Sequence, residues 1–145
     1  MNKLSQNSED KLSTCDPAIQ KVIRLAISRS EIDFGVSHGH RTPQEQNELY
    51  KKGRNGVPGP IVTYKDGYTR KSKHNELPSL AVDIFCAPKA IMYDQKHLTY
   101  VAGVIMCCAK ELGVKLEWGH NWNGNGLLVD SDPNERFSDM PHFQL

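Results

Sequence analysis

Residues 72–86 of the chain, SKHNELPSLAVDIFC, decide its fold. From Leu80 to Cys86 this stretch is apolar enough for a strand inside a hydrophobic core. Asp83 interrupts the apolar run, and a carboxylate in such a strand is costly to bury unless it is paired or binds a metal. Alternation along a half-exposed strand would instead turn Asp83 toward water. His74 places an imidazole in the same stretch, just before the strand.

Around this strand the sequence predicts three helices. Asp16 followed by Pro17 is an N-cap with proline at the first helical position. The TPQE pattern at residues 42–45 is a capping box. Gly113 ends a third run of apolar residues at helical spacing. The predicted helices cover residues 16–27, 42–52 and 98–112.

The sequence also predicts further strands, at residues 34–37, 114–118 and 141–145. Asp66-Gly67 is typical of a two-residue turn and predicts a hairpin of residues 61–65 and 68–71. Residues 1–15 are polar and are predicted to be an irregular lead-in. The mixture indicates an α+β fold, with a small and mainly antiparallel sheet packed with helices.

Length and composition restrict the kind of protein. A chain of 145 residues suffices for one domain and is too short for two ordinary ones. Its 18 Lys and Arg residues balance 17 Asp and Glu residues, so no long-range field favours nucleic acid or an anionic membrane. No apolar run is long enough to insert in a bilayer. The first residues lack the apolar stretch of a signal peptide, so we expect the protein to accumulate in the cytoplasm where it is made.

The cysteines show no C-x-x-C spacing, which argues against a thiolate zinc site. We expect them to be free thiols, most of them buried. They are Cys15, Cys86, Cys107 and Cys108.

Four residues carry the candidate chemistry: His74, Asp83, Asp139 and His142. Two imidazoles and one carboxylate are the ligand set of a catalytic zinc site, which keeps a fourth position open for water. Asp139, three residues before the last histidine, is a second carboxylate that can move protons. A lone histidine is more often a surface or core residue than a ligand, so the spacing alone leaves zinc as one reading among several.

The same residues lie in four stretches that match one known family and together span nearly the whole chain. The stretches are residues 7–12 with the following helix, 39–42, 72–83, and 118–122 through 139–142. On these stretches the chain resembles the zinc D-Ala-D-Ala carboxypeptidase/L-alanyl-D-glutamate peptidase family, which includes the VanY-type peptidases. Within it the chain is most similar to the short phage endolysins. The Ser-x-His…Ala-x-Asp block and the terminal Asp-x-x-His are specific, whereas Gly-x-Arg-Thr alone is weak.

The resemblance implies a role for each candidate residue. His74, Asp83 and His142 would bind zinc. Asp139 would be the general base toward the zinc-bound water and then the acid toward the leaving amine. Arg41 would steady the substrate carbonyl or a substrate carboxylate, with a structural salt bridge as the alternative.

The implied function is that of a phage endolysin that hydrolyses the L-alanyl–D-glutamate bond of peptidoglycan stem peptides. A hedgehog/DD-peptidase-like fold, one catalytic domain over residues 1–145 without a separate wall-binding domain, and a monomer are expected with it. The enzyme would stay in the host bacterial cytoplasm until lysis and then reach the cell wall and periplasm. A D-Ala-D-Ala carboxypeptidase, a non-catalytic zinc-bearing binding module and a non-haem iron oxygenase remain alternatives.

Two segments call for separate interpretation. The connection from His74 to Asp83 is two residues longer than is usual in the family, and Glu76 within it could touch substrate or metal. In some phage relatives the loop at residues 121–132 binds a regulatory calcium. Here asparagines stand where acids would be better ligands, so calcium would bind weakly, and an Asn/Gly turn loop is the alternative.

Overall fold

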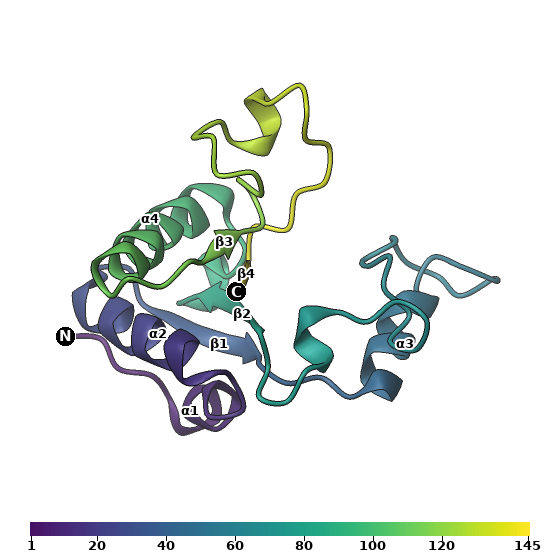
Figure 1. Cartoon of the computed structure of the whole chain (residues 1–145), viewed down its shortest axis with the longest axis horizontal. Helices are drawn as coiled ribbons and strands as arrows, with labels where there is room; N and C mark the ends of the chain where they lie inside the picture. The colour runs from purple at the N-terminus through teal and green to yellow at the C-terminus, as the bar shows by residue number, and fades with distance from the viewer.

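The computed structural model describes residues 1–145, which form four helices and four short strands (Figure 1). The helices are α1 (Gln6–Leu12), α2 (Pro17–Arg29), α3 (Pro43–Lys51) and α4 (Gln95–Glu111), and the strands are β1 (Phe34–His38), β2 (Ala81–Cys86), β3 (Glu117–Trp118) and β4 (His142–Gln144). Single 3-10 turns lie at Lys73–Asn75, Lys89–Ile91 and Val129–Ser131.

The four strands form one sheet in the order β1-β2-β4-β3, and every pair is antiparallel. Asp83 in β2 is opposite His142 in β4 and is also paired with His38 in β1. Residues paired across strands lie on the same face of a sheet. The register of the sheet therefore places His38, Asp83 and His142 next to one another. The predicted α+β fold with an antiparallel sheet is confirmed.

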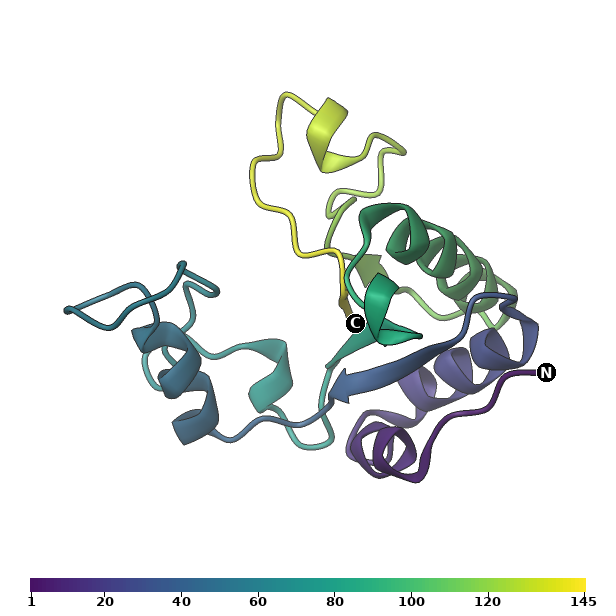
Figure 2. The ribbon, with the colours of Figure 1, turned by 180° about the vertical axis from the view of Figure 1, so that it is seen from behind.

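Helices α2 and α4 cover one face of this sheet. Val82, Ile84 and Cys86 alternate into a core shared with apolar residues of α2 and α4, whereas Asp83 faces the other way. In Figures 1 and 2, α1, α2 and α4 gather around the sheet, while α3 and its loops project to one side. Polar residues of β2 and β4 are thus left on the face that the helices do not cover.

Local capping explains where the helices begin and end. The Asp16 side chain accepts a hydrogen bond from the amide of Ala18, and both halves of the capping box at Thr42 and Glu45 are present. Gly113 follows α4 with a φ of +70°, a conformation that glycine adopts without strain. The three helices expected from the sequence are confirmed, with bounds that differ by a few residues.

The prediction of an irregular segment over residues 1–15 is wrong, because Gln6–Leu12 form α1. Its N-cap is Ser5, whose side chain accepts from the amide of Ser8. Only Ser8 and Leu12 of this helix are buried, which is too few to show a period in the sequence. The hydroxyl of Ser8 also accepts from the amide of Val36 at 3.0 Å, so contact with β1 anchors the helix.

The hairpin predicted around Asp66-Gly67 is also wrong, since residues 61–71 contain no strand. One carboxylate oxygen of Asp66 accepts from the amides of Tyr68, Thr69 and Arg70 at 2.8 to 2.9 Å. A side chain that takes several backbone donors competes with a strand ladder. The segment is therefore a loop closed by one carboxylate. The strand predicted at residues 114–118 is also shorter in the structure, where it is β3.

Two further expectations concern the cysteines and the absence of a membrane-spanning segment. All four cysteines are free, with Cys107 exposed and the other three buried. No helix combines the length and the apolar character needed to cross a bilayer.

Candidate metal centre and active site

Three of the predicted site residues converge on the open face of the sheet. His74 lies in the turn Lys73–Asn75, Asp83 in the middle of β2 and His142 at the start of β4. The Nε2 atom of His74 is 3.1 Å from Oδ1 of Asp83 and 3.2 Å from Nδ1 of His142. The remaining side of this triangle, His142 Nδ1 to Asp83 Oδ1, is 3.0 Å.

In each histidine ring, the nitrogen that points away from the other two ligands is hydrogen-bonded to an acceptor. This bond determines which ring nitrogen carries the hydrogen. Nδ1 of His74 donates to the carbonyl oxygen of Gly39 at 2.7 Å, and Nε2 of His142 donates to Oε1 of Gln144 at 2.9 Å. The Gln144 amide is oriented in turn because its nitrogen donates to Glu117 at 3.0 Å. A neutral imidazole has one donor and one acceptor nitrogen. Both inward nitrogens are therefore bare lone pairs, as metal binding requires.

This geometry fits a metal ion. With both outward nitrogens donating, two nitrogen lone pairs and a carboxylate oxygen lie 3.0 to 3.2 Å apart, an arrangement that a bound cation stabilises. Tetrahedral ligands at 2.0 to 2.1 Å from a zinc ion lie about 3.4 Å from one another, close to the spacing found here. The His74, Asp83 and His142 group can thus hold a metal ion.

Without a metal, the contacts among His74, Asp83 and His142 would favour a proton on His142. Burial by itself would lower the pKa of His142, but its bonds with Asp83 raise the pKa above the ordinary value. Burial would likewise raise the pKa of Asp83, yet the two imidazoles hold it well below its usual range. Asp83 is therefore a carboxylate, ready to act as a ligand.

Asp139 lies beside the ligand group and lines the same cleft. Its amide donates to the carbonyl of Gly119 at 2.7 Å, and its carbonyl accepts from the amide of His142 at 3.1 Å. Burial raises the pKa of the Asp139 carboxyl, and the negative charge of Asp83 raises it further. A carboxyl that must accept and then give a proton near neutral pH needs such a shift.

Arg41 lines the cleft, but its side chain contacts a candidate ligand. It is 7% exposed; one terminal nitrogen donates to Gln46 at 2.9 Å, and the other lies 3.3 Å from Oδ2 of Asp83. Arg41 thus holds the Asp83 oxygen that does not face the histidines. The salt bridge considered as its alternative role is present, and the role toward substrate stays a prediction.

These residues lie in a cleft with a volume of about 670 Å³. Glu76, in the long connection, lines the cleft but does not belong to the ligand group. The connection returns to β2 because it is tied to the N-terminal part of the chain: the amide of Ser79 donates to Thr14 at 2.8 Å and its carbonyl accepts from Asp16 at 2.9 Å. Its extra length therefore leaves Asp83 in register with β4.

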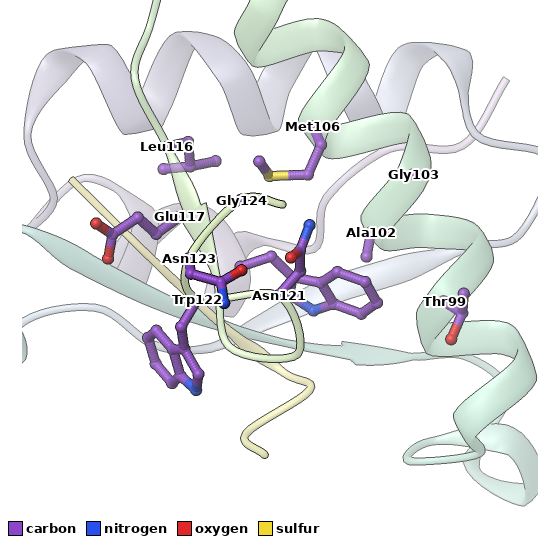
Figure 3. Close-up of a pocket in the computed structure, with 11 residues that line it drawn as sticks. Thr99, Ala102, Gly103, Met106, Leu116, Glu117, Asn121, Trp122, Asn123 and Gly124 are labelled. Atoms are coloured by element: carbon purple, nitrogen blue, oxygen red, sulfur yellow. The ribbon is translucent and has the colours of Figure 1, made fainter. Parts of the chain in front are cut away.

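A second cavity, of about 430 Å³, lies between α4 and the loop after β3 (Figure 3). Thr99, Ala102 and Met106 extend from the helix on one side, and residues 121–124 lie on the other. Trp122 lines both cavities, so the loop separates the second cavity from the candidate active site.

The loop considered for calcium is closed by its own hydrogen bonds. Asp132 accepts from the side chains of Asn123 and Asn125 at 2.9 and 2.8 Å and from the amide of Asn134 at 2.9 Å. These bonds lower the pKa of Asp132, with Asn123 contributing most. The asparagines thus act as donors to the acid in this structure, and calcium binding stays a prediction.

The sequence reasoning did not find the residues that orient the ligands, which are Gly39, Gln46, Glu117 and Gln144. One signal was available. Gln144 is two residues after His142, so both side chains lie on the same face of a strand. Gln46 gave no signal, because nothing in the sequence shows that this one polar residue of α3 is buried.

Comparison with known proteins gives one consistent result. The family described as phage L-alanyl-D-glutamate peptidase matches over residues 1–145. The chain is 30% identical over 128 residues to the L-alanyl-D-glutamate peptidase of Escherichia phage T5, which covers 88% of this chain and 87% of that protein. It is 32% identical over 130 residues to the peptidoglycan L-alanyl-D-glutamate endopeptidase CwlK of Bacillus subtilis (strain 168), which covers 85% of this chain and 66% of that protein.

A solved structure shows the same similarity. The crystal structure of the Serratia marcescens L-Ala D-Glu endopeptidase ChiX superposes with a TM-score of 0.70 at 27% identity, and the match covers 100% of this chain and 90% of that one. The predicted fold and the resemblance stated from the sequence are both confirmed.

Proposed function

Because this chain belongs to the phage L-alanyl-D-glutamate peptidase family, we propose that it hydrolyses its substrate with a zinc ion held by His74, Asp83 and His142. It is a peptidase for the bond between L-alanine and D-glutamate in peptidoglycan, as its relatives are. The zinc ion and the role of each residue are what we add. The observation that carries them is the triangle of bare ligand atoms, 3.0 to 3.2 Å apart, with Asp139 beside it.

Zinc would supply Lewis acidity, which polarises the scissile carbonyl and lowers the pKa of a coordinated water from about 15.7 to about 7. The residues of the chain move the protons. Asp139 accepts a proton from the attacking water as the new C–O bond forms at the alanine carbonyl. It then delivers that proton to the D-glutamate nitrogen as the C–N bond breaks. The immediate products are the alanine carboxylic acid and the D-glutamate amine; the acid then gives its proton to the amine, so a carboxylate and an ammonium group leave and atoms and charges balance.

The surrounding residues keep the ligands in place for this reaction. Gly39 and Gln144 hold the two rings in the required tautomers, while Arg41, itself held by Gln46, holds Asp83. Such partners of metal ligands are typically worth 10- to 100-fold in metal affinity or activity.

The rival readings are less well supported. Every relative reported above is named for the L-alanyl–D-glutamate bond, which favours the endopeptidase over a D-Ala-D-Ala carboxypeptidase. A silent binding module would have no need of a carboxyl with a raised pKa beside the ligands. We place the action of the enzyme at the bacterial cell wall, reached from the host cytoplasm at lysis, because peptidoglycan lies there.

Digestion of a defined muropeptide tests the proposal. New D-glutamate amino termini should appear, and activity should disappear with a chelator and return with zinc. Metal analysis of the same sample should find zinc. Release of free D-alanine without new D-glutamate termini would show the carboxypeptidase instead, and full activity in metal-free protein would exclude the metal mechanism.

A further inference from the structure

We propose that Lys65, Lys71 and Lys73, here called the lysine rim, bind the free α-carboxylate of the D-glutamate next to the scissile bond. The inference rests on the proposed function, because it names the part of that substrate that the rim recognises. In a stem peptide, D-glutamate continues through its γ-carboxyl group. Its α-carboxylate therefore stays free, one carbon away from the nitrogen of the bond that is cut.

The lysine rim lines the same cleft as the ligand group and Asp139. All three lysines are exposed, and none of them forms a salt bridge. An unpaired ammonium group at the wall of a cleft can accept an anionic ligand without first giving up a protein partner. Three such groups from one segment of the chain line the cleft that also holds the ligand group and Asp139.

The formal excess of positive charge in the chain lies at this cleft. Four of the 18 basic residues line it, Arg41 and the lysine rim, against three of the 17 acidic residues, Glu76, Asp83 and Asp139. The rest of the chain then has 14 residues of each sign, so the formal excess of +1 belongs to the cleft. A divalent metal ion would add two further positive charges. With a metal ion bound, the cleft therefore favours an anion, although the protein as a whole is nearly neutral.

Hydrogen bonds hold the backbone of Lys65 and Lys73 in a fixed place relative to the ligands. The carbonyl of Lys65 accepts from Gln46 at 3.0 Å, and the same Gln46 binds Arg41. The carbonyl of Lys73 accepts from the amide of Leu80 at 3.1 Å, and Lys73 directly precedes His74. The ammonium groups thus extend from anchored positions on flexible stems, which allows them to close on a carboxylate.

Arg41 is less able than the lysine rim to bind this carboxylate. It is 7% exposed, and both of its terminal nitrogens already contact Gln46 and Asp83. Its charge is directed at a candidate ligand. The lysines are the cations of the cleft that remain available.

Amidation of the α-carboxylate provides the test, because it removes the charge and changes the size little. We would compare two synthetic stem peptides that differ only in a D-glutamate α-carboxylate or α-carboxamide. The wild-type protein should have a kcat/KM about 10-fold higher for the carboxylate, the size of one charge-assisted hydrogen bond. The K65Q/K71Q/K73Q variant should lose this preference through a higher KM for the carboxylate peptide, with the carboxamide peptide unaffected.

The matched control is K21Q/K96Q/K110Q, which removes three exposed lysines outside the cleft and gives the same net charge. It should keep the wild-type preference. The single variants K71Q and K73Q, each with circular dichroism and zinc content, separate recognition from folding. Each should show a smaller loss of preference with an unchanged spectrum.

The outcomes distinguish this inference from the proposed function. If the wild-type protein cleaves both peptides with the same kcat/KM, the lysine rim does not recognise the carboxylate, and the inference fails. The proposed peptidase function is unaffected by this result. If the triple variant raises KM equally for both peptides, the lysines attract peptide without recognising the carboxylate, and the inference fails. If neither peptide is cut, the proposed function itself is wrong.

Discussion

Replacing Gly119 by alanine should displace Asp139 without removing any candidate ligand. A Cβ atom on Gly119 would lie 2.1 Å from the carbonyl oxygen of Asp139 and 3.0 Å from its carbonyl carbon. Real Cβ contacts below 3.0 Å are essentially absent, so this backbone must move by at least about 0.9 Å. The amide of Asp139 is bonded to the Gly119 carbonyl as well, so the strain acts directly on the segment that carries the carboxyl.

The expected size of the effect follows from this shift. A misplacement of about 1 Å at a catalytic group costs about 100-fold, so kcat should fall by about that factor. Overpacking costs about 1–3 kcal/mol. With an unfolding entropy of about 2.1 cal/mol/K per residue, that cost lowers the Tm of a 145-residue chain by about 3 to 10 °C. The protein should thus remain folded at the temperature of the assay.

Steady-state kinetics on a defined muropeptide, zinc content and thermal unfolding measure these three quantities. Gly103→Ala is the control, because a Cβ atom there has nothing within 4 Å and Gly103 lies within α4. It should keep its activity and gain up to about 1 kcal/mol of stability from the better helix propensity of alanine. A Gly119→Ala variant with full zinc content and wild-type kcat would refute the assignment of proton transfer to Asp139.

The remaining predictions concern single side chains. Asp139→Asn should lower kcat by about 10²- to 10⁴-fold while the zinc content stays the same, as measured by kinetics and metal analysis. Gln144→Leu removes the acceptor that fixes the His142 tautomer and should weaken zinc binding about 10- to 100-fold in a chelator competition. At about pH 8, only Cys107 should react rapidly with a thiol reagent, because burial raises the pKa of Cys15 to about 12 and keeps it a neutral thiol.

A specific result would contradict each of these three predictions. Asp130→Asn changes an exposed carboxylate in the same loop and should leave kcat unchanged, so an equal loss in both variants would point to the loop rather than to proton transfer. Unaltered zinc affinity in Gln144→Leu would mean that the tautomer does not depend on this contact. Rapid labelling of more than one thiol in folded protein would contradict the buried core around Cys15 and Cys108.

The sequence predicted the elements whose signals are local. Asp16 and the capping box at Thr42 act through neighbours two or three residues away, so their helices could be read directly. The candidate ligands could be named because His74, Asp83 and His142 lie in motifs of a known family. Their convergence is a property of the sheet register, which the sequence does not display.

What the sequence did not predict depends on contacts between distant segments. Ser8 anchors α1 to β1 through one hydroxyl, which no periodicity reveals. The carboxylate of Asp66 turned an expected hairpin into a loop, because it took the donors that a strand ladder would need. Gln46 and Gln144 are ordinary amides in the sequence, and only the fold shows that each is bonded to a residue of the candidate site.

The place of β4 in the sheet couples assembly of the site to closure of the sheet. The strand that comes last along the chain fills the gap between β2 and β3, and it brings His142 with it. A nascent chain that ends before residue 142 has an interrupted sheet and two ligands instead of three. Domains fold as their segments leave the ribosome, so the three-ligand site can form only after residue 142 has emerged and β4 has entered the sheet.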